Sequence, residues 1–247
     1  MRNIKLTIMY DGKDFNGWQK QPNKLNIQGT IEKVLSEMTG EEIELNASGR
    51  TDAGVHSFGQ VANFKTNSKI PIEKFPIAIN SKIKKSIVIT NAEEVEERFH
   101  SRYNCKRKTY RYVIDNSEFP TPIYRYLEYH IPNKLNIEEM KKAAKYFEGE
   151  YDFKAFKSSG TSSKSSVRTI YKAEVKKAEN NRIYIELTGN GFLYNMVRII
   201  SGTLVEVGLG RIKPEEIKNI IESKDRHKAG KTLPAHGLYL MNVNYKN

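Results

Sequence analysis

The sequence predicts an α+β fold made of two similarly built halves that share a mixed or antiparallel sheet. Three observations lead to this prediction. Apolar residues alternate with a period of two in several runs, as in half-buried strands, and they repeat with helical spacing in others. In both halves the order is a strand, a helix, two strands and a further helix. With 247 residues, the chain is long enough for two such halves, which we expect at 1–104 and 105–247.

The first half begins with an alternating strand from Ile4 to Tyr10, followed by a loop rich in turn residues. Apolar residues over 31–38 then repeat with helical spacing, after a candidate cap at Thr30 and before Gly40. The remaining elements expected here are a strand–loop–strand unit over 43–64, a helix over 72–83 and a strand over 87–89.

The second half begins with an alternating strand over 106–114, and an amphipathic helix follows over 137–147. Residues 158–166 are small and polar, which predicts a mobile loop. The remaining elements expected here are strands over 170–175, 183–187 and 238–245, an apolar helix over 196–207 and a helix that starts near Pro214.

Composition narrows the class of partner. Lys and Arg number 41 against 29 Asp and Glu, so the formal net charge is +12. This excess favours a polyanionic partner bound through phosphates, although a lysine-rich surface alone would produce the same number. Cys105 is the single cysteine, which excludes an internal disulfide and a cysteine-built zinc site and fits a reducing cytoplasm. The five histidines lack metal-binding spacing and no apolar run could span a membrane, so we expect neither metal nor membrane.

One loop carries a candidate catalytic carboxylate. Residues 48–56 read Ser-Gly-Arg-Thr-Asp-Ala-Gly-Val-His, which places Asp52 two residues after Arg50 and between two strand patterns. A loop held between strands can present a side chain at a fixed geometry. Because no second acid lies nearby in sequence, Asp52 suits covalent nucleophilic catalysis better than paired acid–base chemistry. An ordinary turn, in which the aspartate bonds its own backbone, fits the same motif.

A second candidate is the basic strand over 105–112. A period of two places Tyr110 and Tyr112 on one face and Arg107 and Arg111 on the other. Aromatic rings among cations can stack on unpaired bases and bind phosphates. A basic strand whose tyrosines lie half in the core explains the pattern equally well.

A third candidate is the turn over 189–198, where two glycines follow a strand and a helix begins. Arg198 lies in the early turns of this helix, and its guanidinium could pair with a carboxylate at the site. An ordinary surface arginine is the alternative.

Taken together, these residues resemble the TruA family of tRNA pseudouridine synthases, from near the first strand to the last. The block around Asp52 is the specific one, and the other matching blocks follow in family order. The matching blocks are Tyr10-Asp11-Gly12, Phe15, Gly17-Trp18-Gln19, Gly49 to His56, Arg98 to Arg102, Tyr110 to Tyr112, Gly191-Phe192, Met196 to Arg198 and Gly237 to Leu240. The resemblance implies the pseudouridine synthase fold.

The resemblance also implies a function, a site and partners. Family members isomerise uridine to pseudouridine at positions 38, 39 and 40 in the anticodon stem-loop of tRNA, as homodimers and without cofactor or metal. Asp52 matches the nucleophile, which attacks the uracil ring or the ribose C1′, and Arg198 would pair with it. Arg50 matches an arginine that helps to extrude the nucleotide, and Tyr110 matches the tyrosine that stacks on the target base.

Three other functions stay open at the level of sequence. They are an RNA-binding module without catalysis, a hydrolase that cuts an N-glycosidic bond and releases uracil, and a synthase of the same kind that modifies another RNA site. The Arg50–Asp52 loop does not separate the synthases from one another, because it serves their common chemistry.

Overall fold

The computed structural model describes residues 1–160 and 165–246, so four residues of the loop expected over 158–166 lie outside it. The described chain forms two compact units. Unit 1 comprises Met1–Lys106 and Tyr239–Asn247, and unit 2 comprises Arg107–Leu238. Each unit contains a mixed sheet with helices, which confirms the α+β class. Within the described residues, no helix is both long enough and apolar enough to cross a membrane.

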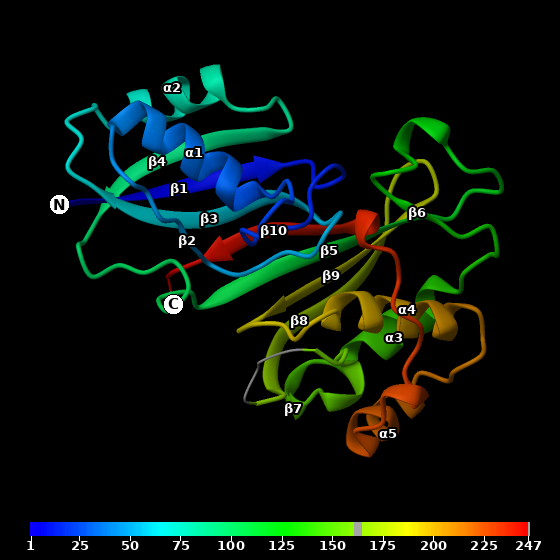
Figure 1. The fold of residues 1–247 in the computed structure, drawn as a ribbon. Coiled ribbons are helices and arrows are strands. Elements are labelled where there is room, and N and C mark those ends of the chain that lie inside the picture. The colour runs from blue at the N-terminus through cyan, green and yellow to red at the C-terminus, as the bar shows by residue number, and fades with distance from the viewer. Residues whose placement is uncertain (161–164, 247) are drawn as a thin grey trace. The chain divides into compact units, whose positions relative to one another are not determined.

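Unit 1 is built on strands in the order β4-β1-β3-β10, with β2 paired to β3 (Figure 1). Its strands are β1 (Arg2–Tyr10), β2 (Asn46–Ala47), β3 (His56–Thr66), β4 (Ile87–Val95) and β10 (Leu238–Asn244), and its helices are α1 (Ile27–Thr39) and α2 (Lys74–Lys82). β1 pairs antiparallel with both β3 and β4. The last strand of the chain, β10, pairs parallel with β3, with Tyr239 opposite His56.

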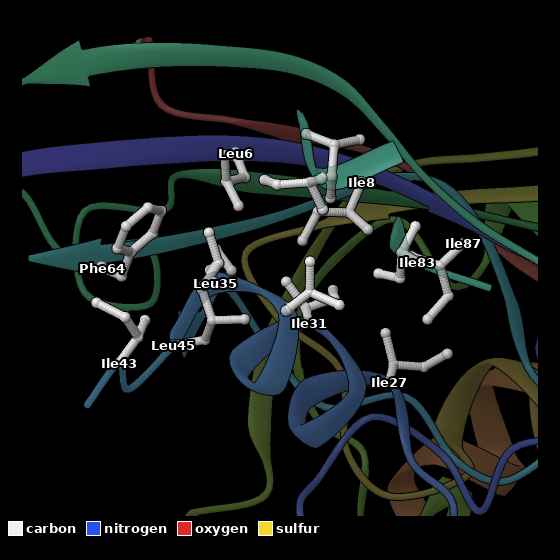
Figure 2. Close-up of a cluster of buried hydrophobic side chains, with 14 of the residues drawn as sticks. Leu6, Ile8, Ile27, Ile31, Leu35, Ile43, Leu45, Phe64, Ile83 and Ile87 are labelled. Carbon is white, nitrogen blue, oxygen red and sulfur yellow. The ribbon is translucent and has the colours of Figure 1, made fainter. Parts of the chain in front are cut away.

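Helices α1 and α2 and the sheet enclose the core of unit 1. Figure 2 shows Ile31 and Leu35 of α1 close to Leu6 and Ile8 of β1, and all four side chains are fully buried. Alternate residues of β1 are buried, as a period of two predicts for a strand with one face on the core. Burial of side chains of this size contributes roughly 1.5–3 kcal/mol each, so this cluster fixes the strands that flank the 48–56 loop.

The start of α1 corrects one prediction. The helix is capped by Asn26, whose side chain accepts the Gly29 N–H at 2.8 Å, and not by Thr30. Thr30 lies inside the first turn and donates its hydroxyl to the Asn26 carbonyl at 2.7 Å. Both residue types can cap, and the start at Ile27 places this buried apolar side chain in the first turn. The predicted end at Gly40 is confirmed, with φ of 71° and its N–H on Ser36 O.

β4 is longer than the predicted strand over 87–89. Its second part carries Glu93 and Glu94, which hide the apolar alternation that signals a strand. These carboxylates pair across the sheet with Lys5 at 2.7 Å and Arg2 at 3.0 Å of β1. The backbone ladder with β1 therefore continues to Val95.

Unit 2 is built on strands in the order β5-β9-β8-β7, all antiparallel, with β6 added parallel to β5 (Figure 1). Its strands are β5 (Arg107–Asp115), β6 (Tyr129–His130), β7 (Gly149–Asp152), β8 (Val167–Lys177) and β9 (Arg182–Gly189), and its helices are α3 (Ile137–Lys145), α4 (Met196–Gly208) and α5 (Glu216–Ser223). α3 packs against β8 and α4. α5 begins two residues after Pro214.

Candidate active site

Asp52 lies in the loop between β2 and β3 of unit 1. Its side chain is half-buried, whereas Arg50 and Ala53 are exposed. The Val55 N–H donates to the Asp52 carbonyl at 3.1 Å, and Gly54 has a φ of 78°, so residues 52–55 form a tight turn. The motif is therefore a true turn, and the turn presents the carboxylate at the surface of unit 1.

The residue before Asp52 is anchored in two directions. Thr51 is 7% exposed, and its hydroxyl lies 2.8 Å from the hydroxyl of Tyr10 at the end of β1. The Thr51 carbonyl accepts the Trp18 N–H at 3.0 Å. Burial raises the pKa of Tyr10 to about 12, and hydrogen bonds with Thr51, Gln60 and Ser57 offset part of that rise. Tyr10 is therefore a neutral hydroxyl at physiological pH.

The first residues of the loop rest on Gln60 of β3. The Ser48 hydroxyl donates to Gln60 Oε1 at 2.7 Å, and Gln60 Nε2 donates to the Gly49 carbonyl at 3.0 Å. The Ser48 and Gln60 side chains are both fully buried. This buried amide therefore ties the start of the loop to β3.

The last residues of the loop are held by Asp11 and Gly12. The Gly12 N–H donates to His56 Nδ1 at 3.1 Å, and a Cβ on Gly12 would lie 2.0 Å from the Val55 carbonyl oxygen. The buried His56 ring stacks on Tyr239 of β10 at 4.9 Å between centroids. His56 Nδ1 also lies 3.0 Å from Asp11 Oδ1, and this contact is an ion pair when the ring is protonated.

In unit 2, the two tyrosines of β5 lie on the buried face of the sheet. Tyr112 is fully buried and donates its hydroxyl to the Pro234 carbonyl at 2.7 Å. Burial raises the pKa of Tyr112, while the charge of Arg198 opposes this rise. Tyr110 keeps 9% exposure and meets Phe192 edge-on at 5.2 Å between ring centroids. Tyr112 is therefore a core residue, as the alternative to a base-stacking surface proposed. Tyr110 lies at the edge of that core.

The opposite face of β5 carries its cations. Arg111 forms a 2.6 Å ion pair with Glu186 on β9 and lies over the Tyr184 ring at 4.5 Å. Arg107 is exposed and lies over Tyr171 at 5.1 Å. Because Glu186 neutralises Arg111, this face offers less free positive charge than the sequence suggests.

Arg198 is not an ordinary surface arginine. It is half-buried in the first turn of α4, where its Nη1 donates to Asn195 Oδ1 and its Nε to the Leu233 carbonyl, both at 2.6 Å. Asn195 adopts a left-handed conformation, with φ of 61°, immediately before the helix. Both of these partners are neutral. Pairing of Arg198 with Asp52 would join unit 2 to unit 1, and it stays a prediction.

Sequence reasoning missed the polar groups beneath the Asp52 loop. Tyr10 and Gln60 lie in strands, where each reads as an ordinary strand residue, and their partners are 41 and 12 positions away in sequence. The one signal in the sequence that could have pointed to Tyr10 is its place in the first block that resembles the TruA family. In the part of the chain that the structure describes, no group of three or more His, Cys, Asp or Glu could hold a metal.

Unit 1 thus presents Asp52 on an anchored turn, in a chain whose net charge is +12. The family model described as tRNA pseudouridine synthase matches residues 6–104 and 143–246. The chain is 55% identical to "tRNA pseudouridine synthase A" of Caldicellulosiruptor saccharolyticus, over 99% of this chain and 100% of that protein. It is 52% identical to the protein of the same name from Acetivibrio thermocellus, with the same coverage.

The chain therefore belongs to the tRNA pseudouridine synthase family, and it is an isomerase. Membership removes the two alternatives outside this class, the binding module and the hydrolase. Among solved structures, a chain in the crystal structure of a Cbf5-Nop10-Gar1 complex is 13% identical with a TM-score of 0.38, over 96% of this chain and 57% of that chain.

Proposed function

We propose that this chain converts uridine to pseudouridine at positions 38, 39 and 40 of the anticodon stem-loop of tRNA, with Asp52 as the nucleophile. The observation that carries the proposal is the placement of Asp52. It is half-exposed, whereas Thr51 and Val55 on either side of its turn are buried. A carboxylate so held can reach a substrate atom without a cost for ordering the loop.

The reaction balances with the substrate and one carboxylate. Asp52 attacks either C6 of the uracil or C1′ of the ribose, and the bond between C1′ and N1 breaks. The base then rotates, a new bond joins C5 to C1′, and Asp52 is released. C5 loses its proton and N1 gains one, so the product is an isomer of the substrate.

The target nucleotide must leave the helical stack before Asp52 can reach it, at a cost of a few kcal/mol. Arg50 is exposed and lies two residues before Asp52, which suits it to occupy the vacated place. Tyr110 would stack on the extruded base and recover part of the cost. Arg198 would pair with Asp52 and favour its ionised form.

The proposal includes a homodimer as the tRNA-binding form and the cytoplasm as the location. The family resemblance supports the dimer, because a joint basic surface of two chains would hold one tRNA. The single cysteine, Cys105, supports a reducing compartment.

The first test is tritium release from tRNA transcripts labelled with [5-³H]uridine, because formation of the C5–C1′ bond expels the hydrogen on C5. We expect release by the wild type and none by Asp52→Asn, with tRNA affinity of the variant within severalfold. Asparagine keeps the size of the side chain but is no nucleophile. An active Asp52→Asn would refute the assignment of the nucleophile, and an equal loss of binding would make Asp52 structural.

The target positions need a separate measurement. Three transcripts, each with a single uridine among positions 38, 39 and 40, should all release tritium, and a transcript with none there should not. Release from that last transcript would assign the enzyme to another site in tRNA and leave the chemistry at Asp52 intact.

A further inference from the structure

We propose that the buried hydroxyl pair of Tyr10 and Thr51 is a positioning device that holds the Asp52 carboxylate in its reactive geometry. The inference rests on the proposed role of Asp52 as the nucleophile. Neither hydroxyl is assigned a contact with the substrate. Both residues would therefore influence Asp52 only through the backbone of the loop.

The pair joins the catalytic loop to the core of unit 1. Tyr10 is the last residue of β1 and is 3% exposed, and its hydroxyl lies 2.8 Å from Thr51 Oγ1. Thr51 immediately precedes Asp52 in the chain. The anchored residue Thr51 and the catalytic candidate Asp52 are therefore joined by one rigid peptide unit, so movement of Thr51 displaces Asp52.

A second anchor makes this peptide hard to rotate. The Thr51 carbonyl accepts the Trp18 N–H at 3.0 Å, and the preceding residue, Gly17, packs directly against the same carbonyl. The hydroxyl and the carbonyl of Thr51 are thus bound to two different segments, β1 and the loop before α1. A rotation about the Thr51 backbone would break at least one of these bonds.

The surroundings of the pair are polar, buried and satisfied. Gln60 and Ser57 oppose the rise that burial causes in the pKa of Tyr10, and Gln60 also holds Ser48 and Gly49 at the start of the loop through hydrogen bonds. All of these residues except Gly49 are buried. Buried networks whose members are satisfied restrict motion more than single exposed bonds do.

The expected loss falls on turnover and not on affinity. Removal of either hydroxyl changes no charge and no exposed side chain, so the groups that meet RNA phosphates stay as they are. A carboxylate displaced by about 1 Å from its attack position can cost about 100-fold in rate. The signature of the device is therefore a reduced kcat with an unchanged dissociation constant for tRNA.

The test uses three variants of the full chain. We expect Tyr10→Phe and Thr51→Val each to lower single-turnover tritium release about tenfold or more, with tRNA affinity within about twofold. Thr51→Ser, which keeps the hydroxyl, should stay close to the wild type. Tyr10→Phe and Thr51→Val each remove the same hydrogen bond, the one between these two hydroxyls. The double variant should therefore be little slower than either single variant.

A matched control separates positioning from stability. Tyr245 is another tyrosine of unit 1, and its hydroxyl donates to the Ser101 carbonyl at 2.8 Å. Tyr245→Phe should lower thermal stability by a similar amount but keep the wild-type rate below the unfolding temperature. The inference fails if Tyr10→Phe behaves like this control, or if Thr51→Ser is as slow as Thr51→Val.

Asp52→Asn, measured beside these variants, separates a failure of the proposed nucleophile from a failure of the positioning role. An active Asp52→Asn refutes the nucleophile and the positioning role together. An inactive Asp52→Asn with a normal Tyr10→Phe refutes the positioning role alone.

Discussion

Single residues decide how closely the two loops of unit 1 approach each other. Gly17 has a φ of 81°, and a Cβ at this position would lie 2.6 Å from the Thr51 carbonyl oxygen. Gly40 has a similar φ of 71°, but a Cβ there would meet nothing within 4 Å. The two glycines therefore share a backbone conformation and differ in the space around them.

We expect Gly17→Ala to destabilise the protein by about 2–4 kcal/mol, since positive φ alone costs about 1–2 kcal/mol and the clash with Thr51 adds to it. Gly40→Ala should cost only about 1–2 kcal/mol. Urea denaturation measures both values, and tritium release should fall only for Gly17→Ala, because only this change pushes on the residue beside Asp52. Equal losses of stability would show that the loops separate easily and that Gly17 is not required for their contact.

At this scale the sequence predicts local features and misses distant ones. Residues 48–56 were recognisable because their turn residues are consecutive, and Trp18 and Phe15 are buried, as their apolar character suggests. The contact of Tyr10 with Thr51 spans 41 positions, and no period or propensity encodes a contact of that range. The ion pair between Arg111 and Glu186 was also not predictable, because these two residues lie far apart in sequence.

At the scale of elements, charge pairing stabilises the exposed face of the sheet in unit 2. Glu174 of β8 lies directly opposite Glu186 of β9, an arrangement of like charges that destabilises a strand pair. Lys176 bridges the two carboxylates at 3.0 and 2.9 Å, and Arg111 approaches Glu186 from the other side. Burial raises the pKa of Glu186, but hydrogen bonds from Lys176 and Arg111 lower it by more. The net pKa is therefore below the usual 4.5.

We expect Lys176→Gln to destabilise the protein by about 0.5–1 kcal/mol at neutral pH, because two opposed glutamates lose their shared cation. The folded-state pKa of Glu186 is depressed, so the stabilisation is present above about pH 4.5 and is lost as the pH falls through the lowered folded value. Urea denaturation at pH 7 and below pH 4 should show the difference from the wild type shrinking with acid.

Lys177 provides the control for this change. It is the exposed neighbour of Lys176 on β8, and no ion pair is found for it among the described residues. Lys177→Gln should leave stability unchanged at both pH values. A loss equal to that of Lys176→Gln would mean that overall charge, and not the bridge, is responsible.

Most elements were predictable, because their patterns of burial are regular and local. The exceptions have physical causes. α1 starts early because Asn26 supplies the cap, and β4 is long because ion pairs replace apolar alternation. The partner of the last strand was not predictable, since β10 returns to β3 of unit 1 across more than 170 residues of chain. Alternation of apolar and polar residues predicts that a segment is a strand, but it does not predict which strand pairs with it.

At the scale of the whole molecule, the dominant feature is a net charge of +12. Attraction of a basic protein to RNA depends on the release of counterions, so its strength falls linearly with salt on logarithmic axes. Cations already held by carboxylates, such as Arg111 with Glu186, release few counterions from RNA. The charge that binds tRNA is therefore a subset of the total, and salt dependence can identify its members.

We expect tRNA affinity to fall steeply with salt, and the slope of log affinity against log salt to decrease by about one when Arg50 is replaced by glutamine. Arg50 is exposed beside the turn that carries Asp52, where it can meet a phosphate or fill the place of a base. Arg111→Gln removes the same charge from a neutralised site and should leave the slope unchanged. Binding titrations between 50 and 200 mM salt measure all three slopes. Equal slopes for the two variants would mean that tRNA senses only the net charge of the chain, which would remove Arg50 from the proposed binding residues.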